Sequence, residues 1–279
     1  MIDTAFHEHI AKIVYDTAQD ILIPAGPNIA QIKIEEKGPN DFVTEIDKVM
    51  EAALTEKLVE ALPGSIVLGE EAAALEPGLI ANLLQTDKPL WIVDPLDGTA
   101  CFINQNGGYG VIVSLLMNGK IVGGWIYDVI TGPVYHMGMM DRLPALPPQR
   151  DVPRGYLGGR IKKTFFGLNL PFDHVEILPM SSMSCTAYRE LLLGEIDFIV
   201  YGKTQPWDHF AGIRMMEERG MTALQWSGVP YTLTARNNGL VLARDAALAQ
   251  TLLDTIVKPV TSQIGFPYAE DDSFRYVAI

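Results

Sequence analysis

Residues 90–99, Leu-Trp-Ile-Val-Asp-Pro-Leu-Asp-Gly-Thr, place two carboxylates in an otherwise apolar stretch. The first four residues predict a short buried strand that delivers Asp94 at its end. A carboxylate beside a buried strand is costly unless it is paired or bound to a metal. Pro95 favours a sharp turn that can bring Asp97 beside Asp94. As alternatives, the Asp-Gly pair is also a common turn, and the final threonine also suits a helix N-cap.

Two further acids follow the same pattern elsewhere in the chain. Glu70 comes directly after the short apolar strand expected at 65–69, and Asp208 opens a helix rich in Phe, Ile and Met. If the strands before Glu70 and Asp94 are neighbours, their carboxylates converge. Oxygen donors without His or Cys favour hard cations such as Mg²⁺, which would also offset the repulsion between the acids. Taken singly, each acid is equally compatible with an ordinary strand end or helix cap.

Composition excludes several classes of protein. The chain has 279 residues, 48% hydrophobic and 20% charged, which is typical of a globular protein with a sizeable core. A net charge of −13 disfavours a nucleic-acid surface, which would need a basic stripe. Acidity alone is also typical of any well-dispersed soluble protein. The two cysteines, Cys101 and Cys185, are too few for a disulfide framework or a zinc cage.

The N-terminal sequence and the apolar runs bear on location. The first residues lack a basic segment followed by an apolar one, so no signal peptide is expected. No apolar run reaches the roughly 18 residues that suggest a membrane span. We therefore expect a cytoplasmic protein without a membrane partner.

Residues 1–142 are expected to form an α+β half that carries the acids at 47, 70, 94 and 97. Apolar residues at helical spacing predict a helix over 4–22 that Pro24 stops, and a second helix from the N-cap Thr44 to about residue 62. Asn118-Gly119 between two apolar runs predicts a β-hairpin, followed by a strand at 134–137.

Residues 143–279 are expected to form an α/β half that carries Asp208. A Pro-rich stretch at 143–148 is interpreted as the connector between the halves. Alternating patterns predict strands at 165–168, 198–201 and 239–243, and helices at 187–193, 208–219 and 245–257.

Four ordered segments resemble motifs of the inositol monophosphatase superfamily. Residues 91–99 are similar to its signature strand and turn. Residues 41–47, Asp-Phe-Val-Thr-Glu-Ile-Asp, resemble its Asp-x-Val-Thr-x-x-Asp segment, and residues 69–71 its Gly-Glu-Glu. Residues 207–212, Trp-Asp-His-Phe-Ala-Gly, resemble its second signature, Trp-Asp-x-Ala-Ala-Gly. Beyond the motifs, the similarity extends thinly over most of the chain.

The resemblance implies a fold and an activity. The fold would be the layered α-β-α-β-α sandwich of inositol monophosphatase and fructose-1,6-bisphosphatase-like sugar phosphatases, an α/β architecture. The activity would be Mg²⁺-dependent hydrolysis of a small phosphorylated metabolite, inhibited by Li⁺. Relatives are commonly homodimers, so a homodimer is a further expectation.

The resemblance also implies which residues bind metal. Glu70, Asp94 and the Leu96 carbonyl would bind a first Mg²⁺, and Asp94, Asp97 and Asp208 a second. A third, weaker ion would also depend on Glu70. The site would therefore hold two or three ions.

Catalytic and substrate roles follow from the same alignment of motifs. Asp47 and Thr99, together with the metal ligand Glu70, would activate the attacking water. The amides of Gly98 and Thr99 would receive the phosphate, and Asp208 would also contact the substrate. For Asp47, the alternative is a surface acid favoured by the helix dipole.

Three departures from the family pattern concern the substrate. Tyr201 occupies the position, seven residues before Asp208, where enzymes acting on inositol phosphates typically carry a glutamate; it would contact the substrate, or be only a strand-end aromatic. Cys101 replaces the usual asparagine and is interpreted as a small packed residue, and the Pro-rich stretch replaces a Gly-rich hairpin. An inositol monophosphate-like substrate is the first expectation; histidinol phosphate, 3′-phosphoadenosine nucleotides and sugar phosphates are alternatives. A non-catalytic protein-binding relative is the alternative from another class.

Overall fold

The computed structural model describes residues 2–38, 41–76, 78–168, 173–179, 183–234 and 238–264. The chain divides into two compact units. The first unit comprises Met1–Leu143, Met183–Arg189 and Trp207–Met215, and the second comprises Pro144–Ser182, Glu190–Pro206 and Met216–Ile279. Asp208 thus belongs to the first unit, whereas the sequence had assigned it to the C-terminal half.

The first unit is built on a five-stranded sheet in the order β3-β4-β5-β6-β7. β3 and β4 are parallel, and the other neighbours are antiparallel. Asn118 and Gly119 join β5 to β6 with φ of 51° and 71°, as the hairpin prediction required. The strands are β3 (Ile66–Gly69), β4 (Leu90–Asp97), β5 (Gly110–Met117), β6 (Lys120–Asp128) and β7 (Val134–His136).

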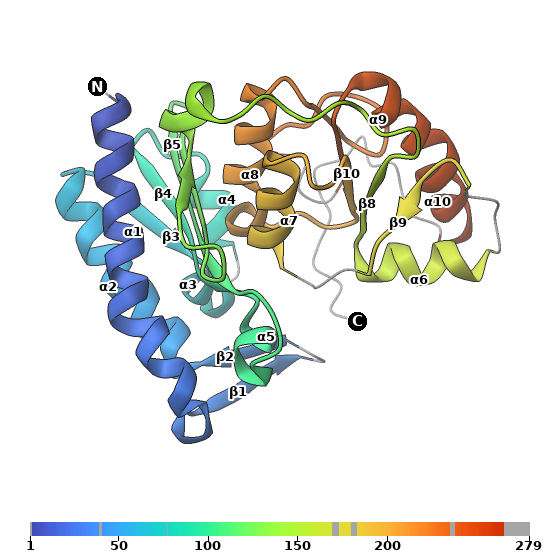
Figure 1. Ribbon diagram of the computed structural model, residues 1–279. Coiled ribbons are helices and arrows are strands. Elements are labelled where there is room, and N and C mark those ends of the chain that lie inside the picture. The colour runs from blue at the N-terminus through green and yellow to red at the C-terminus, as the bar shows by residue number, and fades with distance from the viewer. Residues whose placement is uncertain are drawn as a thin grey trace. The chain divides into compact units, whose positions relative to one another are not determined.

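Helices α1 (Thr4–Ala25) and α2 (Glu45–Ala61) lie side by side against this sheet (Figure 1). Their apolar stripes meet the sheet in one core, whose largest fully buried side chains include Trp91 and Trp125. Pro24 lies in the last turn of α1, so the helix ends one residue beyond the predicted stop.

Segments of α7 (Ser184–Leu192) and α8 (Pro206–Glu218) complete the first unit. They approach the rest of the unit closely because glycines face them. A Cβ on Gly124 of β6 would lie 3.3 Å from Cα of Ala211 in α8, and a Cβ on Gly212 would lie 2.3 Å from the ring of Tyr188 in α7. This packing explains why the helix bearing Asp208 joins the first unit.

Short elements fill the rest of the first unit. β1 and β2 form a separate antiparallel pair, and α5 follows the end of β4. These elements are η1 (Gly26–Gln31), β1 (Ile34–Gly38), β2 (Asp41–Thr44), α3 (Glu70–Leu75), α4 (Leu79–Leu83), α5 (Thr99–Asn104) and η2 (Met137–Arg142).

The second unit contains a mixed sheet in the order β11-β12-β10-β8-β9. Its helices bury a second core against this sheet. The elements are β8 (Arg154–Leu157), α6 (Gly159–Gly167), β9 (Glu176–Ile177), β10 (Phe198–Tyr201), β11 (Thr222–Leu224), β12 (Leu240–Ala243), α9 (Ala246–Leu252), the π-helical η3 (Leu253–Val257) and α10 (Lys258–Ile264).

One strand prediction in this unit is wrong. The run expected as a strand at 165–168 begins within helix α6 instead. Ile161 and Phe165 are one helical turn apart, and both are buried in the second core. A short apolar run fits both the helical and the strand periodicity. Here the spacing of four residues between Ile161 and Phe165 indicates the helix.

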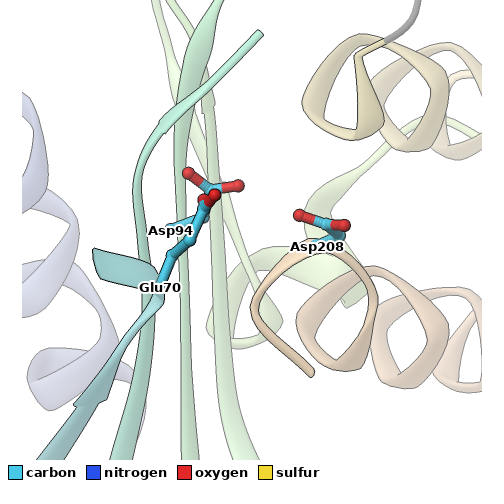
Figure 2. Close-up of side chains that lie close together, drawn as sticks. All are labelled: Glu70, Asp94 and Asp208. Carbon is cyan, nitrogen blue, oxygen red and sulfur yellow. The ribbon is translucent and has the colours of Figure 1, made fainter. Parts of the chain in front are cut away.

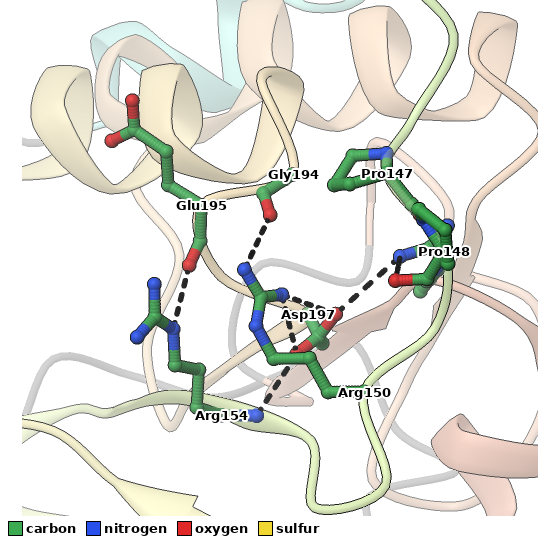
Figure 3. A network of polar contacts seen from close by, with 8 residues as sticks. Pro147, Pro148, Arg150, Arg154, Gly194, Glu195 and Asp197 are labelled. Carbon is green, nitrogen blue, oxygen red and sulfur yellow. Dashed lines mark hydrogen bonds and ion pairs between the residues drawn. The ribbon is translucent and has the colours of Figure 1, made fainter.

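Buried Asp197 organises the junction between the Pro-rich stretch and the second sheet. Its carboxylate accepts hydrogen bonds from Arg150 Nη1 at 2.9 and 3.0 Å and from the Arg154 amide at 3.0 Å (Figure 3). Arg244 Nη1 lies 3.6 Å from the same carboxylate, and its guanidinium also donates to the carbonyls of Pro147 and Pro148. The Pro-rich stretch is therefore anchored to the second unit by arginines that share one acid.

Candidate metal centre

Three carboxylates of the first unit converge: those of Glu70, Asp94 and Asp208. One oxygen from each lies within 4.8 Å of the others. Figure 2 shows Glu70 and Asp94 extending from the strand side and Asp208 facing them from a helix. Gly69 pairs with Val93 in parallel register, so the residues that follow them, Glu70 and Asp94, lie side by side. The convergence predicted from neighbouring strand ends is confirmed.

The electrostatics of this cluster centre on Asp94, which is only 1% exposed. Burial raises the pKa of Asp94 well above its ordinary value, and the charges of Glu70, Asp97 and Asp208 raise that pKa further. A hydrogen bond with the Asp208 side chain acts in the same direction. The ionised cluster is therefore unfavourable by itself, and a bound cation would relieve it.

The turn after Asp94 is held by the acid itself. Asp94 Oδ1 accepts the amide of Leu96 at 3.0 Å, and the β4–β5 register shifts between Asp94 and Asp97. The Leu96 carbonyl accepts the Thr99 hydroxyl at 3.0 Å, which leaves one lone pair for another partner.

Asp97 follows the turn and is held by the start of α7. Its carboxylate is not a member of the three-residue cluster, although its charge acts on Asp94. Asp97 accepts the amides of Ser184 at 3.1 Å and Cys185 at 2.6 Å, both from the first turn of α7. Burial raises the pKa of Asp97, and hydrogen bonds from the Cys185 side chain and from these two amides oppose that rise.

Asp47 and Thr99, distant in sequence, lie in contact. Asp47 is the N3 residue of α2 and forms a capping box with Thr44, whose amide and hydroxyl both bond to Asp47 Oδ2. The other oxygen, Oδ1, lies 3.1 Å from Thr99 Oγ1. Asp47 is 2% exposed, and burial raises its pKa.

Gly98 and Tyr201 were also predicted site residues. Gly98 precedes α5 with φ of 84°, and a Cβ there would lie 2.7 Å from the Met183 side chain and 3.1 Å from the Gly108 carbonyl. Glycine is therefore required by both conformation and space. Tyr201 is buried at the end of β10 and belongs to the second unit.

Several residues around the centre were not among the predicted ones. The α7 amides on Asp97 carry no sequence signal, because any residue can supply a backbone N–H. Asp128, which accepts Arg189 Nε at 3.0 Å and the Thr186 hydroxyl at 3.0 Å, fixes α7 to the end of β6. Glu51 did carry a signal, since it lies one helical turn after Asp47 on the same face of α2.

Comparisons with known proteins agree with this arrangement. A model of the inositol monophosphatase family matches residues 6–139. Inositol-1-monophosphatase of Bacillus subtilis is 28% identical over 249 residues, which cover 82% of this chain and 91% of that protein. Nus factor SuhB of Escherichia coli K12 is 26% identical over 250 residues, covering 81% and 89% respectively. The crystal structure of an IMPase/NADP phosphatase complexed with Mg²⁺ and phosphate superposes with a TM-score of 0.71 at 19% identity, covering 89% and 95%.

These matches and the carboxylate centre define the class of protein as a phosphatase with a layered α/β fold, as the sequence predicted. The family model and these relatives support the inositol monophosphatase superfamily, which the four sequence motifs resemble. Within the described residues, no helix combines the length and the apolar character that a membrane crossing requires.

Proposed function

We propose that this protein is a Mg²⁺-dependent phosphomonoesterase that hydrolyses a small phosphorylated metabolite. The observation that carries the proposal is the convergence of Glu70, Asp94 and Asp208 around a nearly unexposed carboxylate of raised pKa. Such a cluster of hard oxygen donors suits Mg²⁺ rather than a softer metal.

Glu70, Asp94 and Asp208, with the Leu96 carbonyl and Asp97 beside them, would hold two or three ions. Bound Mg²⁺ supplies Lewis acidity, lowering the pKa of a coordinated water and neutralising charge on the phosphoryl group. Each carboxylate oxygen of Asp97 accepts one amide of α7, and Asp97 would join through a further lone pair of these oxygens. The neighbour solved with Mg²⁺ and phosphate supports this choice of metal.

Asp47 and Thr99 would accept the proton of the attacking water. Thr44 engages only one oxygen of Asp47, and the other faces the Thr99 hydroxyl at 3.1 Å. The Thr99 hydroxyl has one proton, which faces both Asp47 Oδ1 at 3.1 Å and the Leu96 carbonyl at 3.0 Å, so its oxygen can still accept a hydrogen bond from water. Because burial raises its pKa, Asp47 is a stronger base than an exposed aspartate. The backbone amides of Gly98 and Thr99, at the start of α5, would receive a phosphate oxygen.

An inositol monophosphate-like substrate is proposed first, because the superfamily and the Bacillus relative's name point to it. Histidinol phosphate, a 3′-phosphoadenosine nucleotide or a sugar phosphate would use the same chemistry, and a tyrosine at position 201 leaves these open. Inhibition by Li⁺ and a homodimeric, cytoplasmic state are further expectations from the family.

The test is phosphate release from a panel of these phosphomonoesters, with and without Mg²⁺. We expect turnover of at least one substrate only when Mg²⁺ is present, and loss of turnover in Glu70→Gln. Absence of turnover on every substrate, together with no Mg²⁺-induced thermal shift, would refute the proposal.

The relatives named Nus factor SuhB favour one second candidate, a protein-binding role for this fold. That role does not need the carboxylates, so it predicts that Glu70→Gln leaves binding to a protein partner unchanged. The panel distinguishes the candidates, since a purely binding protein releases no phosphate.

A further inference from the structure

Helix α3 begins with the proposed metal ligand Glu70 but has no side-chain cap of its own. Its N-cap residue is Gly69, which offers no side-chain oxygen to the free amides of the first turn. A serine or aspartate at an N-cap normally accepts the amides of the second or third helical residue. In α3 these are the amides of Glu71 and Ala72.

The missing cap comes from another helix. Glu51 of α2 accepts the Glu71 amide with Oε2 at 2.8 Å and the Ala72 amide with Oε1 at 3.1 Å. Each carboxylate oxygen therefore holds one amide. Together the two bonds fix the direction in which α3 leaves β3, and Glu70 lies at that junction.

Gly69 makes room for this arrangement. A Cβ built on Gly69 would lie 2.1 Å from both Cδ and Oε2 of Glu51. Its φ of −93° is accessible to any residue, so the glycine is required for space rather than for conformation.

We infer that Glu51 is a positioning residue for the metal centre, which caps α3 from outside and thereby orients Glu70. The inference rests on the proposed role of Glu70 as a metal ligand. Partners that orient a metal ligand typically contribute about 10- to 100-fold to metal affinity. Glu51 also borders a cavity of about 810 Å³, so its truncation frees amides that water can reach.

The experiment measures Mn²⁺ binding to the purified, metal-free full-length protein by electron paramagnetic resonance, and Mg²⁺ binding by calorimetry. Glu51→Ala removes both acceptors, and Glu51→Gln keeps the shape but can accept only one amide. We expect both to weaken binding by about tenfold or more. Glu60→Gln, on an exposed position of the same helix, is the matched control and should bind like the wild type.

A pair of variants at position 69 tests the capping geometry itself. Gly69→Ser alone should weaken binding, because its Cβ collides with Glu51. In Glu51→Ala that space is free, so the added serine can cap α3 locally and restore affinity. A harmful substitution that becomes beneficial is not expected of a residue with a merely structural role. Circular dichroism of each variant verifies folding.

The outcomes separate the two proposals. If Glu70→Gln loses the metal while both Glu51 variants bind like Glu60→Gln, the positioning role is overturned and the metal centre stands. A double variant no better than Glu51→Ala alone would overturn the capping argument. If the wild type binds neither ion, both proposals fail.

Discussion

Asp94 and Asp197 are both 1% exposed, yet their surroundings are opposite. Asp94, in the first unit, lies among other carboxylates; burial raises its pKa well above the ordinary value, and the charges of these neighbours raise it further. Asp197, in the second unit, lies among arginines, with Arg150 at 2.9 Å and Arg244 at 3.6 Å. A buried acid with cationic neighbours is satisfied by the fold itself, whereas one among acids needs a partner from outside.

The difference separates stability from function within one chain. Arg150 and Arg154 also donate to the carbonyls of Gly194 and Glu195, so the arginines around Asp197 hold loops and strands together. The acids around Asp94 store unfavourable charge that a cation would neutralise. The comparison therefore predicts that neutralising Asp94 stabilises the metal-free fold, whereas neutralising Asp197 destabilises it.

Asp94→Asn is expected to have the largest effect. It should lower kcat/KM at least about 100-fold, exceeding the usual loss from an outer-shell partner. Because burial and the neighbouring acids disfavour the charged form, the metal-free variant should be more stable than the metal-free wild type. Phosphate release and metal-free thermal melts check both effects. A near-normal kcat would contradict the role of Asp94 as a metal ligand.

Asp197→Asn should act in the opposite sense on stability. The amide replaces an acid whose arginines are then left without a counter-charge, so the free energy of unfolding should fall by about 3 kcal/mol. The folded fraction should still bind Mg²⁺ with wild-type affinity. Denaturant melts and calorimetry measure the two quantities, with exposed Asp151→Asn as the control. If the folded variant bound Mg²⁺ more weakly than the wild type, Asp197 would not serve stability alone.

His136 is a buried histidine whose positively charged form the fold disfavours, as it disfavours the negative charge of Asp94. Burial, with the charges of His7 and Arg142, lowers the pKa of His136 to about 4, while the opposing charge of Glu8 is weaker. In the unfolded chain, His136 has its ordinary pKa near 6.5 and is therefore protonated first as the pH is lowered. The free energy of unfolding should consequently decrease as the pH is lowered from 6.5 to about 4.

His136→Gln tests this dependence without touching the metal centre. It should flatten the change of melting temperature with pH across that window, because the titrating group is gone. His9→Gln, at an exposed position, should keep the wild-type slope. Equal slopes in all three proteins would assign the pH dependence to other groups.

Tyr201→Phe should have the smallest effect. Tyr201 lies in the second unit, outside the carboxylate cluster, so the variant removes one hydroxyl without altering the metal ligands. We expect KM to rise by about fivefold at most, with kcat unchanged, since one neutral hydrogen bond contributes about 1 kcal/mol or less. Steady-state kinetics on the best substrate of the panel decide this. A tenfold fall in kcat would give Tyr201 a role in the chemistry.

Local sequence patterns predicted most of what positions the centre. Thr44 is the expected N-cap of α2, and it forms a capping box with Asp47, three residues later. Glu70 and Asp94 each follow a short apolar strand, and parallel neighbours bring such strand ends together. In both cases the decisive contacts lie within one element or between adjacent strands.

The remainder depended on contacts between distant segments. The amides that hold Asp97 come from residues 184 and 185, and their donation depends on where α7 packs rather than on residue type. Helical spacing places Glu51 on the face of Asp47, but its contact with Gly69 depends on how α2 packs beside β3. The helix at 159–167 was missed because a short apolar run is ambiguous between two periodicities.

The proposed ligands stand at positions 70, 94 and 208, and the first unit recruits Trp207–Met215 only after the chain has passed through much of the second. A chain emerging from the ribosome would thus carry two of these acids long before the third. High-affinity metal capture would begin only when translation has passed residue 215 and that segment has docked. Metal uptake would therefore mark the late, post-docking stage of biogenesis, and incomplete chains would be left without the ion.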